Sequence, residues 1–390
     1  MLLKKECAMK KNIFLTGGTG FVGRNLIPRI LNQDLNAEVN VLVREKSKID
    51  GKRRFVNFLS SLSEEIDTEQ AISRSKVIEG DIALKNFGLP DKEYSELAGR
   101  VTHIIHSAAS VEFQLPLQKA RETNCTGTAR VMELARHSQK AGKLERVAYV
   151  STAYVSGNRT GTIFESELKC GQEFSNTYEQ SKYEAEQMVN DLKSELPVTV
   201  FRPSIIVGDS KTGRTSAFNV LYYPLKLIYL GMLRFIPGSS RTPLDVVPVD
   251  FVCDAICHIL FKTNKGVGQT YHLTAGADRI NTTGEIVEMA VDFFNHSISS
   301  SRIYNPKFIP LELYRAVRWI FYSRAKDLLE KIEQYIPYLY GKKIFDNSNT
   351  MHVLRDSSIT VPHFHQYYRR LLQYCIEVDW GKTTTIDALG

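Results

Sequence analysis

The sequence has little cysteine, no long uninterrupted apolar run and no block of like charge. Its 390 residues include six cysteines, which form neither a CxxC pair nor a regular spacing. A disulfide framework is therefore not expected, no metal site is predicted, and a reducing cytoplasm fits. The most apolar segment, 217–237, contains Pro224, Lys226 and Arg234. These residues make it a poor membrane span but a suitable lining for an apolar pocket.

The basic excess is modest and spread along the chain. Fifty Lys and Arg against 43 Asp and Glu give a net charge of +7. Without a basic run, a nucleic-acid partner is not predicted, and a phosphorylated ligand explains the excess. Cys253 and Cys257 fall in an expected helix, where we predict core packing. Met9, just before the first expected strand, is a candidate start besides Met1.

Apolar β-rich runs alternate with helical stretches over the first half of the chain. The run "NIFLT" at 12–16 leads into a glycine turn and a helix-period stretch. Further expected strands lie at 38–45, 101–110, 146–157 and 198–208. This alternation predicts an α/β fold, a doubly wound parallel sheet of the Rossmann type. A smaller, mainly helical substrate region should follow from about residue 209.

Three glycines, Gly17, Gly20 and Gly23, stand in "TGGTGFVG" between the first strand and helix. Glycine permits a tight turn, lets the backbone approach a pyrophosphate and packs the helix against its strand. The N–H groups at the helix N-terminus then favour phosphate. The pattern predicts a dinucleotide site.

The residues after the second strand bear on the choice of cofactor. A dinucleotide fold that prefers NAD carries an acidic residue there, whereas this chain has Arg44, with Lys46 and Lys48 close by and Glu45 between them. A cation suits a 2′-phosphate, and Arg24 is a second candidate for it. NADPH is therefore expected rather than NADH.

The stretch "TYEQSKYEAEQ" at 177–187 places Tyr178 and Lys182 four residues apart. On a helix these two share a face, whereas Tyr183 is rotated away and should pack or lie on the surface. Tyr178 is the predicted proton donor. Lys182 should draw its pKa, about 10 when unperturbed, towards neutrality.

The motifs "TGGTGFVG", "HSAASV" and "VSTAYVSG", followed by Tyr178 and Lys182, resemble the extended short-chain dehydrogenase/reductase family over about residues 12–290. The resemblance implies that Thr152 is the catalytic hydroxyl residue beside Tyr178 and Lys182. It implies that Asn124 supports a water chain to Lys182. The implied cofactor-binding residues are Thr16, Gly17, Gly20, Phe21, Val22, Gly23, Arg24, Arg44, Asp81, Ile82, Ser107, Ala108, Ala109, Ser151, Lys182, Pro203, Ser204 and Ile205.

Three further segments are similar to a narrower branch. "FRPSIIVGDSKTG" at 201–213 resembles thioester reductases and fatty acyl-CoA reductases, while "KIFDNSNT" at 343–350 and "EVDW" at 377–380 resemble the C-terminal domain of alcohol-forming fatty acyl-CoA reductases. The resemblance implies a reductase domain over 10–290 and a small helical domain over 300–385. It implies NADPH-dependent reduction of a medium- or long-chain acyl thioester, carried by CoA or an acyl carrier protein, with either the aldehyde or the alcohol as the product.

Several alternatives stay open at this point. A sugar-nucleotide epimerase or dehydratase, a hydroxysteroid dehydrogenase and a non-catalytic NADP-binding sensor share parts of the pattern. The stretch 308–343 is helical in period, aromatic on one side and basic on the other. It is either a helix packed on its own domain or one lying on a membrane surface. The oligomeric state has no signal in the sequence.

Overall fold

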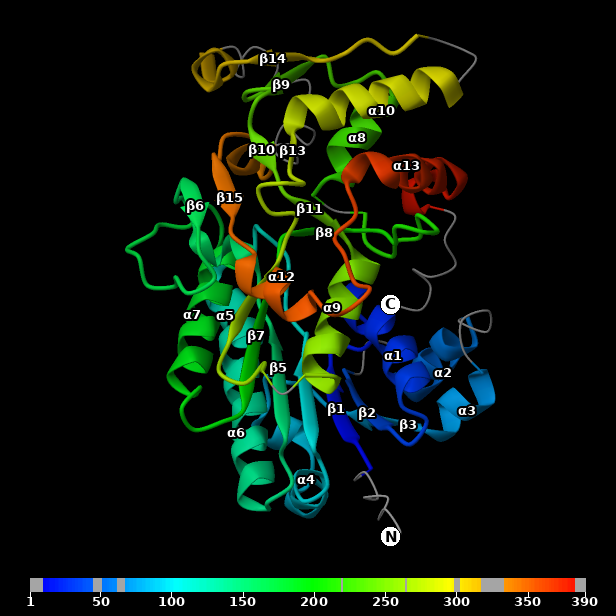
Figure 1. Ribbon diagram of the computed structural model, residues 1–390, viewed down its shortest axis with the longest axis vertical. Helices are drawn as coiled ribbons and strands as arrows, with labels where there is room; N and C mark the ends of the chain where they lie inside the picture. The colour runs from blue at the N-terminus through cyan, green and yellow to red at the C-terminus, as the bar shows by residue number, and fades with distance from the viewer. Residues whose placement is uncertain are drawn as a thin grey trace.

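A seven-stranded parallel sheet forms the centre of the computed structural model, which describes residues 10–44, 51–61, 67–218, 220–263, 265–297, 302–316 and 333–382. The strand order is β12-β7-β5-β4-β1-β2-β3 (Figure 1). This confirms the predicted doubly wound sheet. The strands are β1 (Asn12–Thr16), β2 (Glu38–Val43), β3 (Ser75–Glu79), β4 (His103–His106), β5 (Arg146–Val150), β7 (Val198–Pro203) and β12 (Thr270–Leu273).

Helices cover both faces of the sheet, and alternate strand residues point to opposite faces. In β1, Ile13 and Leu15 join one buried cluster with α1 and α9, whereas Phe14 joins another with α4, α6 and α7. This period of two is the geometry of a strand buried on both sides. The helices are α1 (Phe21–Gln33), α2 (Gly51–Ser60), α3 (Thr68–Ser73), α4 (Asp91–Ala98), α5 (Leu117–Arg121), α6 (Gly127–Lys140), α7 (Thr177–Asp191) and α9 (Val249–Phe261). Cys253 and Cys257 are fully buried in α9, as predicted.

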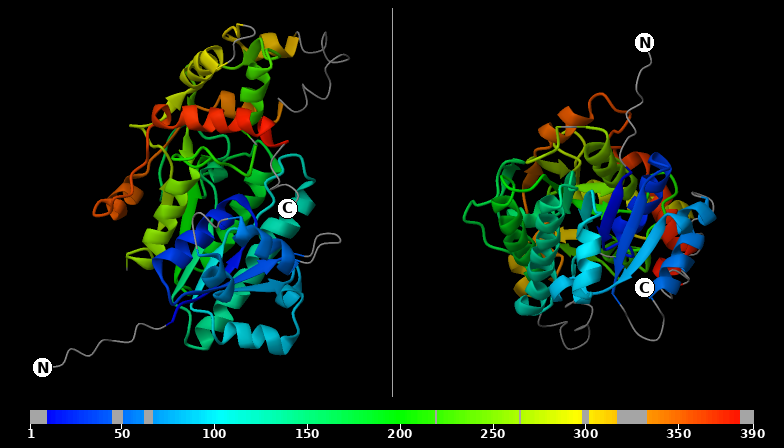
Figure 2. Two further views of the ribbon diagram at one scale, coloured as in Figure 1. Left: turned by 90° about the vertical axis from the view of Figure 1, so that its right-hand side faces the viewer. Right: turned by 90° about the horizontal axis from the view of Figure 1, so that it is seen from below.

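A second layer lies beyond the carboxyl ends of the strands, in the upper half of Figure 1 and the upper part of Figure 2, left. It has its own apolar core. Its helices are α8 (Tyr222–Tyr229), α10 (Thr283–Ser297) and α13 (Tyr368–Glu377). Short strand pairs support it: β8 (Ile205–Val207) with β11 (Val246–Pro248), β9 (Phe235–Pro237) with β14 (Lys307–Ile309), and β10 (Pro243–Leu244) with β13 (Asn281–Thr282). Short helical turns along the chain are the 3-10 turns η1 (Lys85–Gly88), η3 (Ala153–Ser156), η4 (Ile336–Leu339), η5 (Phe364–Gln366) and η6 (Asp379–Gly381), and the π-helical turn η2 (Glu122–Thr126).

The C-terminal segment returns to the sheet domain. Strand β15 (Lys343–Phe345) pairs with β6 (Gly161–Ile163), and α12 (Ser348–Leu354) contacts β12 and α9. The two segments predicted as domains therefore share contacts and a core, and the boundary near 290–300 stays a prediction. Figure 1 shows β15 and α12 at the level where the two layers meet.

The single helix predicted over 308–343 is wrong at both ends. Residues up to Ile309 belong to β14, residues 311–316 are helical, and β15 starts at Lys343. The ends are extended because Lys307–Ile309 and Lys343–Phe345 each hydrogen-bond to a partner strand distant in sequence. Residues 317–332 lie outside the described part. Among the described residues, no helix is both long and apolar enough to cross a bilayer.

Candidate active site

The predicted catalytic side chains meet where α7 packs against the end of β5. Asn176 starts α7 by accepting a hydrogen bond from Glu179 N at 2.9 Å, a side-chain cap for the helix N-terminus. The side chain of Tyr178 hydrogen-bonds to that of Thr152. Lys182 Nζ donates to Val150 O at 2.9 Å. Three of the four predicted catalytic residues thus lie in one place.

Tyr183 has the different environment that its position on α7 predicts. Its ring packs on Phe174 at a centroid distance of 4.9 Å, and its hydroxyl accepts from Gln187 Nε2 at 2.8 Å. These contacts confirm a packing role for Tyr183.

Burial governs the charges of this site. It raises the pKa of Tyr178 to about 12, although the Thr152 hydrogen bond acts in the opposite direction. Burial lowers the pKa of Lys182 to about 8, and the nearby Glu186 carboxylate opposes that shift. The predicted lowering of the Tyr178 pKa by Lys182 is therefore wrong for this structure. The Lys182 ammonium lies against Val150 O and the Tyr149 ring, 4.5 Å from the ring centroid, and desolvation of Tyr178 dominates.

Asn124 lies behind Lys182, in the π-helical turn η2. Its amide donates to Ser181 Oγ at 2.9 Å and to Ser110 O at 3.1 Å, and its Oδ1 accepts from Ser110 N at 2.8 Å. A π-helical turn inside an α-helix often marks a functional position. One bond fixes Asn124 against Ser181, the residue that precedes Lys182, and the other two fix it against Ser110.

The glycine turn is too close-packed for side chains at two of its positions. Gly17 has φ +73°, and a Cβ there would lie 2.6 Å from Ala108 N; a Cβ on Gly23 would lie 2.1 Å from Gly17 O. A Cβ on Gly20 would meet nothing closer than Gly17 O, at 3.1 Å, among the described residues. Gly20 therefore leaves the N-terminus of α1 open. The first turn, FVGR, contains no Asp or Glu, so this end suits a pyrophosphate.

A hydrogen-bond chain fixes the floor beneath the glycine turn. Thr16 Oγ1 lies 2.6 Å from His106 Nδ1, and His106 Nε2 lies 3.0 Å from Thr128 Oγ1. Ser107 Oγ donates to Thr16 O at 3.0 Å, and Ala108 N donates to Thr16 Oγ1 at 3.3 Å. These bonds hold the ends of β1 and β4, with Ala109, at the turn.

The predicted adenosine-binding residues come together at the ends of β2 and β3. Arg44 Nη1 lies 4.0 Å from Asp81 Oδ2, and the Arg44 side chain is 57% exposed. Ile82 follows Asp81 and lies against Gly127. The Arg24 guanidinium lies 5.2 Å from the Phe58 ring centroid. Glu45, Lys46 and Lys48 lie outside the described residues.

The remaining predicted cofactor residues divide among three environments. Ser151 and Pro203 end or follow β5 and β7 beside Thr152, whose Oγ1 lies 3.5 Å from Pro203 O. Ser204 is buried next to them. Phe21 and Val22 start α1. Ile205 instead lines an apolar pocket in the second layer.

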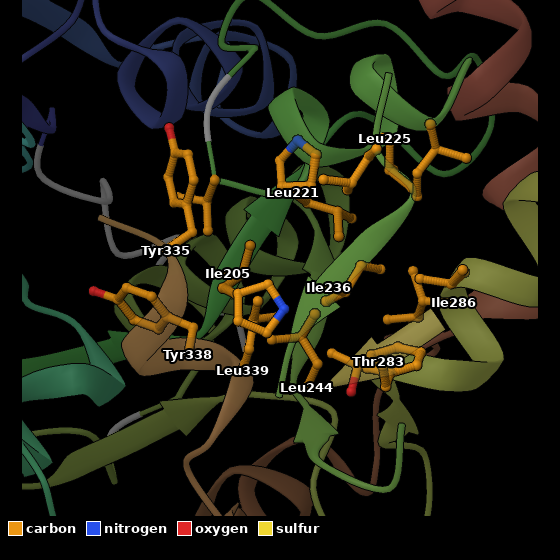
Figure 3. Close-up of a pocket in the computed structure, with 17 residues that line it drawn as sticks. Ile205, Leu221, Leu225, Ile236, Leu244, Thr283, Ile286, Tyr335, Tyr338 and Leu339 are labelled. Atoms are coloured by element: carbon orange, nitrogen blue, oxygen red, sulfur yellow. The ribbon is translucent and has the colours of Figure 1, made fainter. Parts of the chain in front are cut away.

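That pocket lies between α8, α10, β9 and η4 (Figure 3). Aliphatic side chains form most of its wall, including Leu221, Leu225, Ile236, Leu244 and Ile286. Part of the wall comes from 217–237, as predicted. Tyr335 and Tyr338 lie on the opposite side of the pocket from Ile286 in Figure 3.

Aromatic side chains connect the tyrosine side of the pocket with Tyr178. The Phe113 ring centroid lies 5.7 Å from that of Tyr338, 6.2 Å from that of Tyr335 and 5.9 Å from that of Tyr178. A second cleft has Phe113 itself in its wall, together with polar residues such as Asn176 and Thr177. The reacting group of a substrate near Tyr178 would thus have an apolar pocket on one side and a polar cleft on the other.

Comparison with known proteins identifies the family. The profile of the NAD-binding "Male sterility protein" family matches residues 15–256, more than half of the chain. The chain belongs to this family. The membership confirms the resemblance to the fatty acyl-CoA reductase and thioester reductase branch of the extended short-chain reductases, and a nicotinamide cofactor fits the open glycine turn.

Relatives within the male sterility family differ in length. The chain is 28% identical over 280 residues to fatty acyl-CoA reductase wat of Drosophila melanogaster, covering 63% of this chain and 53% of the relative. It is 29% identical over 272 residues to nonribosomal peptide synthetase asaC of Aspergillus flavus, covering 67% of this chain and 26% of that protein. The chain thus spans about half the length of the fly reductases that it matches.

Solved structures with a similar fold match almost the whole length of this chain. The terminal R domain of the myxalamid PKS-NRPS biosynthetic pathway has 25% identity and a TM-score of 0.77, covering 96% of this chain and 92% of that one. An epimerase of UDP-glucuronic acid from Bacillus cereus, solved with NAD, has a TM-score of 0.66 at 16% identity, with coverage of 97% and 100%. The second likeness concerns the fold alone.

The sequence did not predict four residues of this site. Phe113 and Tyr338 connect the pocket with Tyr178, and Glu186 and Arg202 form a buried pair beside Ser151. Glu186 has a signal in the sequence, because it lies four residues after Lys182 and so on the same helical face. The other three are brought in by contacts that no local pattern reveals.

Proposed function

We propose that this chain is an NADPH-dependent reductase of medium- or long-chain acyl thioesters. The observation that carries the proposal is the position of Tyr178, which hydrogen-bonds to Thr152 and is connected through the Phe113 ring with Tyr338 in the wall of an apolar pocket. The names of the relatives, fatty acyl-CoA reductase and nonribosomal peptide synthetase, support the same substrate class. The carrier is CoA or an acyl carrier protein.

The chain's own residues would act on the thioester carbonyl. A bound nicotinamide cofactor supplies the hydride. Thr152 and Tyr178 would donate hydrogen bonds to the carbonyl oxygen as it gains negative charge. Addition of the hydride to the thioester carbonyl carbon gives a hemithioacetal. Its collapse breaks the carbon–sulfur bond and releases the thiol and an aldehyde. A second reduction, with Tyr178 giving a proton to the alkoxide, would yield the alcohol.

The substrate would use the two spaces beside Phe113. The alkyl chain fits the apolar pocket, where each buried methylene contributes about 0.8 kcal/mol. The thiol-bearing arm fits the more polar cleft by Asn176 and Thr177. Phe113 would separate the two halves of the substrate at the thioester.

The preference for NADPH is part of the proposal. Arg44 directly follows β2, and its side chain is largely exposed near Asp81, where it could meet a 2′-phosphate. We expect Arg44→Ala to weaken NADPH binding by about tenfold while leaving NADH binding within about twofold, because one charge-assisted phosphate contact is lost. Equilibrium fluorescence titration measures both affinities. Lys85→Ala, an exposed cation elsewhere, is the matched control.

The test of the function is cofactor oxidation with identified products. Purified protein is given NADPH and acyl-CoA of several lengths, and products are analysed by gas chromatography. We expect fatty aldehyde or alcohol from the wild type, little from Tyr178→Phe, and normal product from Tyr183→Phe. NADPH oxidation with an acyl thioester of an acyl carrier protein, but not with acyl-CoA, would show that the substrate is carried by that protein. Turnover of a UDP-sugar or a steroid in place of every thioester would contradict the proposal.

A further inference from the structure

Two side chains of α7, one turn apart, hold the end of β5. Lys182 Nζ donates to Val150 O at 2.9 Å, and Glu186 Oε2 accepts the hydroxyl of Ser151. The next residue is Thr152, the partner of Tyr178. The position of Thr152 therefore depends on two α7 side chains, and Glu186 has no part in the proposed chemistry.

The other oxygen of Glu186 is held by Arg202 of β7. Arg202 Nε lies 2.8 Å and Nη2 2.5 Å from Glu186 Oε1, and both side chains are at most 3% exposed. Replacing a buried ion pair with apolar groups is often neutral or stabilising, so the pair is weak evidence for stability alone. A positioning role explains why two charges lie buried here.

Arg202 is in turn oriented from the neighbouring strand. His272 of β12 is its direct partner across the β7–β12 pair, with Nε2 3.2 Å from Arg202 Nη1. Because Arg202 can only donate, His272 Nε2 accepts and Nδ1 carries the proton. Nδ1 donates to Asp346 O at 2.6 Å. This neutral tautomer agrees with burial, which lowers the pKa of His272 to about 3.

The network ends in the C-terminal segment. Glu165 Oε1 accepts from His272 N at 2.8 Å and from Thr350 Oγ1 at 2.9 Å, and Glu165 Oε2 accepts from Asn349 N at 2.7 Å. Glu165 and Thr350 are almost completely buried. Hydrogen bonds thus run without a break from residues 346–350, through His272 of β12, Arg202 of β7 and Glu186 of α7, to the residue beside Thr152.

We propose that Glu186 is a positioning residue of the active site and that residues 346–350 hold it in place through Glu165, His272 and Arg202. Glu186 orients the Ser151–Thr152 end of β5 and presents a negative charge to Lys182. The groups facing Lys182 are Glu186 on its own helix, Cys125 from η2, Tyr149 from β5 and His106 from β4. Glu186 is the carboxylate of this set, and its charge opposes the loss of charge on Lys182.

The first experiment needs no substrate. Competitive labelling of lysines with trace acetic anhydride, read by mass spectrometry against pH, gives the titration midpoint of Lys182. Glu186→Gln keeps an acceptor for Ser151 but removes the charge, so we expect the Lys182 midpoint to fall by about one pH unit. Lys11, which precedes β1 at the other end of the sheet, is the internal reference. An unchanged Lys182 midpoint would overturn the proposal.

The second experiment uses the C-terminal end of the network. Thr350→Val removes the hydroxyl with little change of shape, and Thr350→Ser restores it. We expect Thr350→Val to lower kcat about tenfold, with KM within about twofold, and to move the basic limb of the pH–rate profile and the Lys182 midpoint to lower pH. Thr350→Ser should behave as the wild type. A loss confined to KM, or equal behaviour of the two variants, would overturn the proposal.

The two readouts separate this inference from the proposed function, on which its catalytic part rests. If the wild type reduces no thioester, the proposed function fails, but the labelling of Lys182 in both variants still decides the role of Glu186. If Glu186→Gln does not fold, the Thr350 pair decides it. Circular dichroism and the melting temperature of each variant establish folding.

Discussion

At the scale of single residues, the charge of Lys182 is the property on which the chemistry depends. Burial lowers its pKa to about 8, whereas burial raises the pKa of Tyr178 to about 12. Below about pH 8 Lys182 is charged and Tyr178 holds its proton. Above that pH Lys182 becomes neutral and no longer stabilises the negative charge that develops on the substrate oxygen.

The predicted result is a fall of kcat/KM above about pH 8. The decrease follows deprotonation of Lys182, since Tyr178 titrates far higher. Initial rates from pH 6 to 10, with enzyme stability checked at each pH, measure the profile. A profile flat to pH 10 would show that the charge of Lys182 is not needed.

A second prediction concerns the open position in the glycine turn. Gly20→Ala places a methyl group 3.1 Å from Gly17 O, a tight contact that a small backbone shift relieves, so the melting temperature should fall only slightly while NADPH affinity falls at least about tenfold. Gly23→Ala should instead destabilise the protein, because its Cβ would lie 2.1 Å from Gly17 O. Calorimetry and fluorescence titration distinguish the two. Unchanged affinity in Gly20→Ala would place the cofactor elsewhere.

At the scale of elements, the pocket between α8 and α10 sets the length of chain that can be bound. Ile286 on α10 lies across the pocket from Tyr335 and Tyr338 in Figure 3. Ile286→Phe adds volume at the end of the pocket away from Tyr178. We expect kcat/KM to fall at least about tenfold for the longest acyl chain accepted and to change little for shorter ones, since each methylene lost from the pocket costs about fourfold.

The matched control for this change is Leu230→Phe. Leu230 follows α8 and is 52% exposed, so the same added ring should not alter chain preference. Competition between acyl-CoA species of different lengths in one reaction measures the ratio of kcat/KM directly. An equal loss at every length in Ile286→Phe would mean that the pocket does not hold the acyl chain.

Elements with a strong local pattern could be predicted from the sequence. The strand at 12–16, the glycine turn and the face shared by Tyr178 and Lys182 depend on residues close in the chain. The ends of the 308–343 stretch could not be predicted, since β14 and β15 form by pairing with β9 and β6. Phe113, Tyr338 and Arg202 reach the site through tertiary contacts, and the pKa of Tyr178 depends on burial that a sequence does not display.

At the scale of the whole molecule, we propose a peripheral membrane contact at the layer that holds the pocket. Met232 and Phe235 are each 55% exposed, close in sequence to Lys226 and Arg234. Such a combination suits an anionic lipid surface. We expect the protein to co-sediment with vesicles containing phosphatidylserine.

The double variant Met232→Glu, Phe235→Glu should reduce this co-sedimentation at least about fivefold, because apolar side chains are replaced by carboxylates that anionic lipid repels. Leu35→Glu, at an exposed apolar position in the sheet domain, is the control and should bind as the wild type. Equal binding by the wild type, the double variant and Leu35→Glu would assign the lipid contact to another surface. If none of the three binds vesicles, the proposed membrane contact is wrong.

The measurement that tests the central claim most directly follows the hydride into the product. The protein is incubated with a long-chain acyl-CoA and NADPH carrying deuterium at the transferred position of C4, and the product is analysed by mass spectrometry. The account predicts one deuterium at carbon 1 of an aldehyde or two at carbon 1 of an alcohol, and no labelled product with Tyr178→Phe. Label that stays on the cofactor, or labelled product formed equally well by Tyr178→Phe, would contradict it.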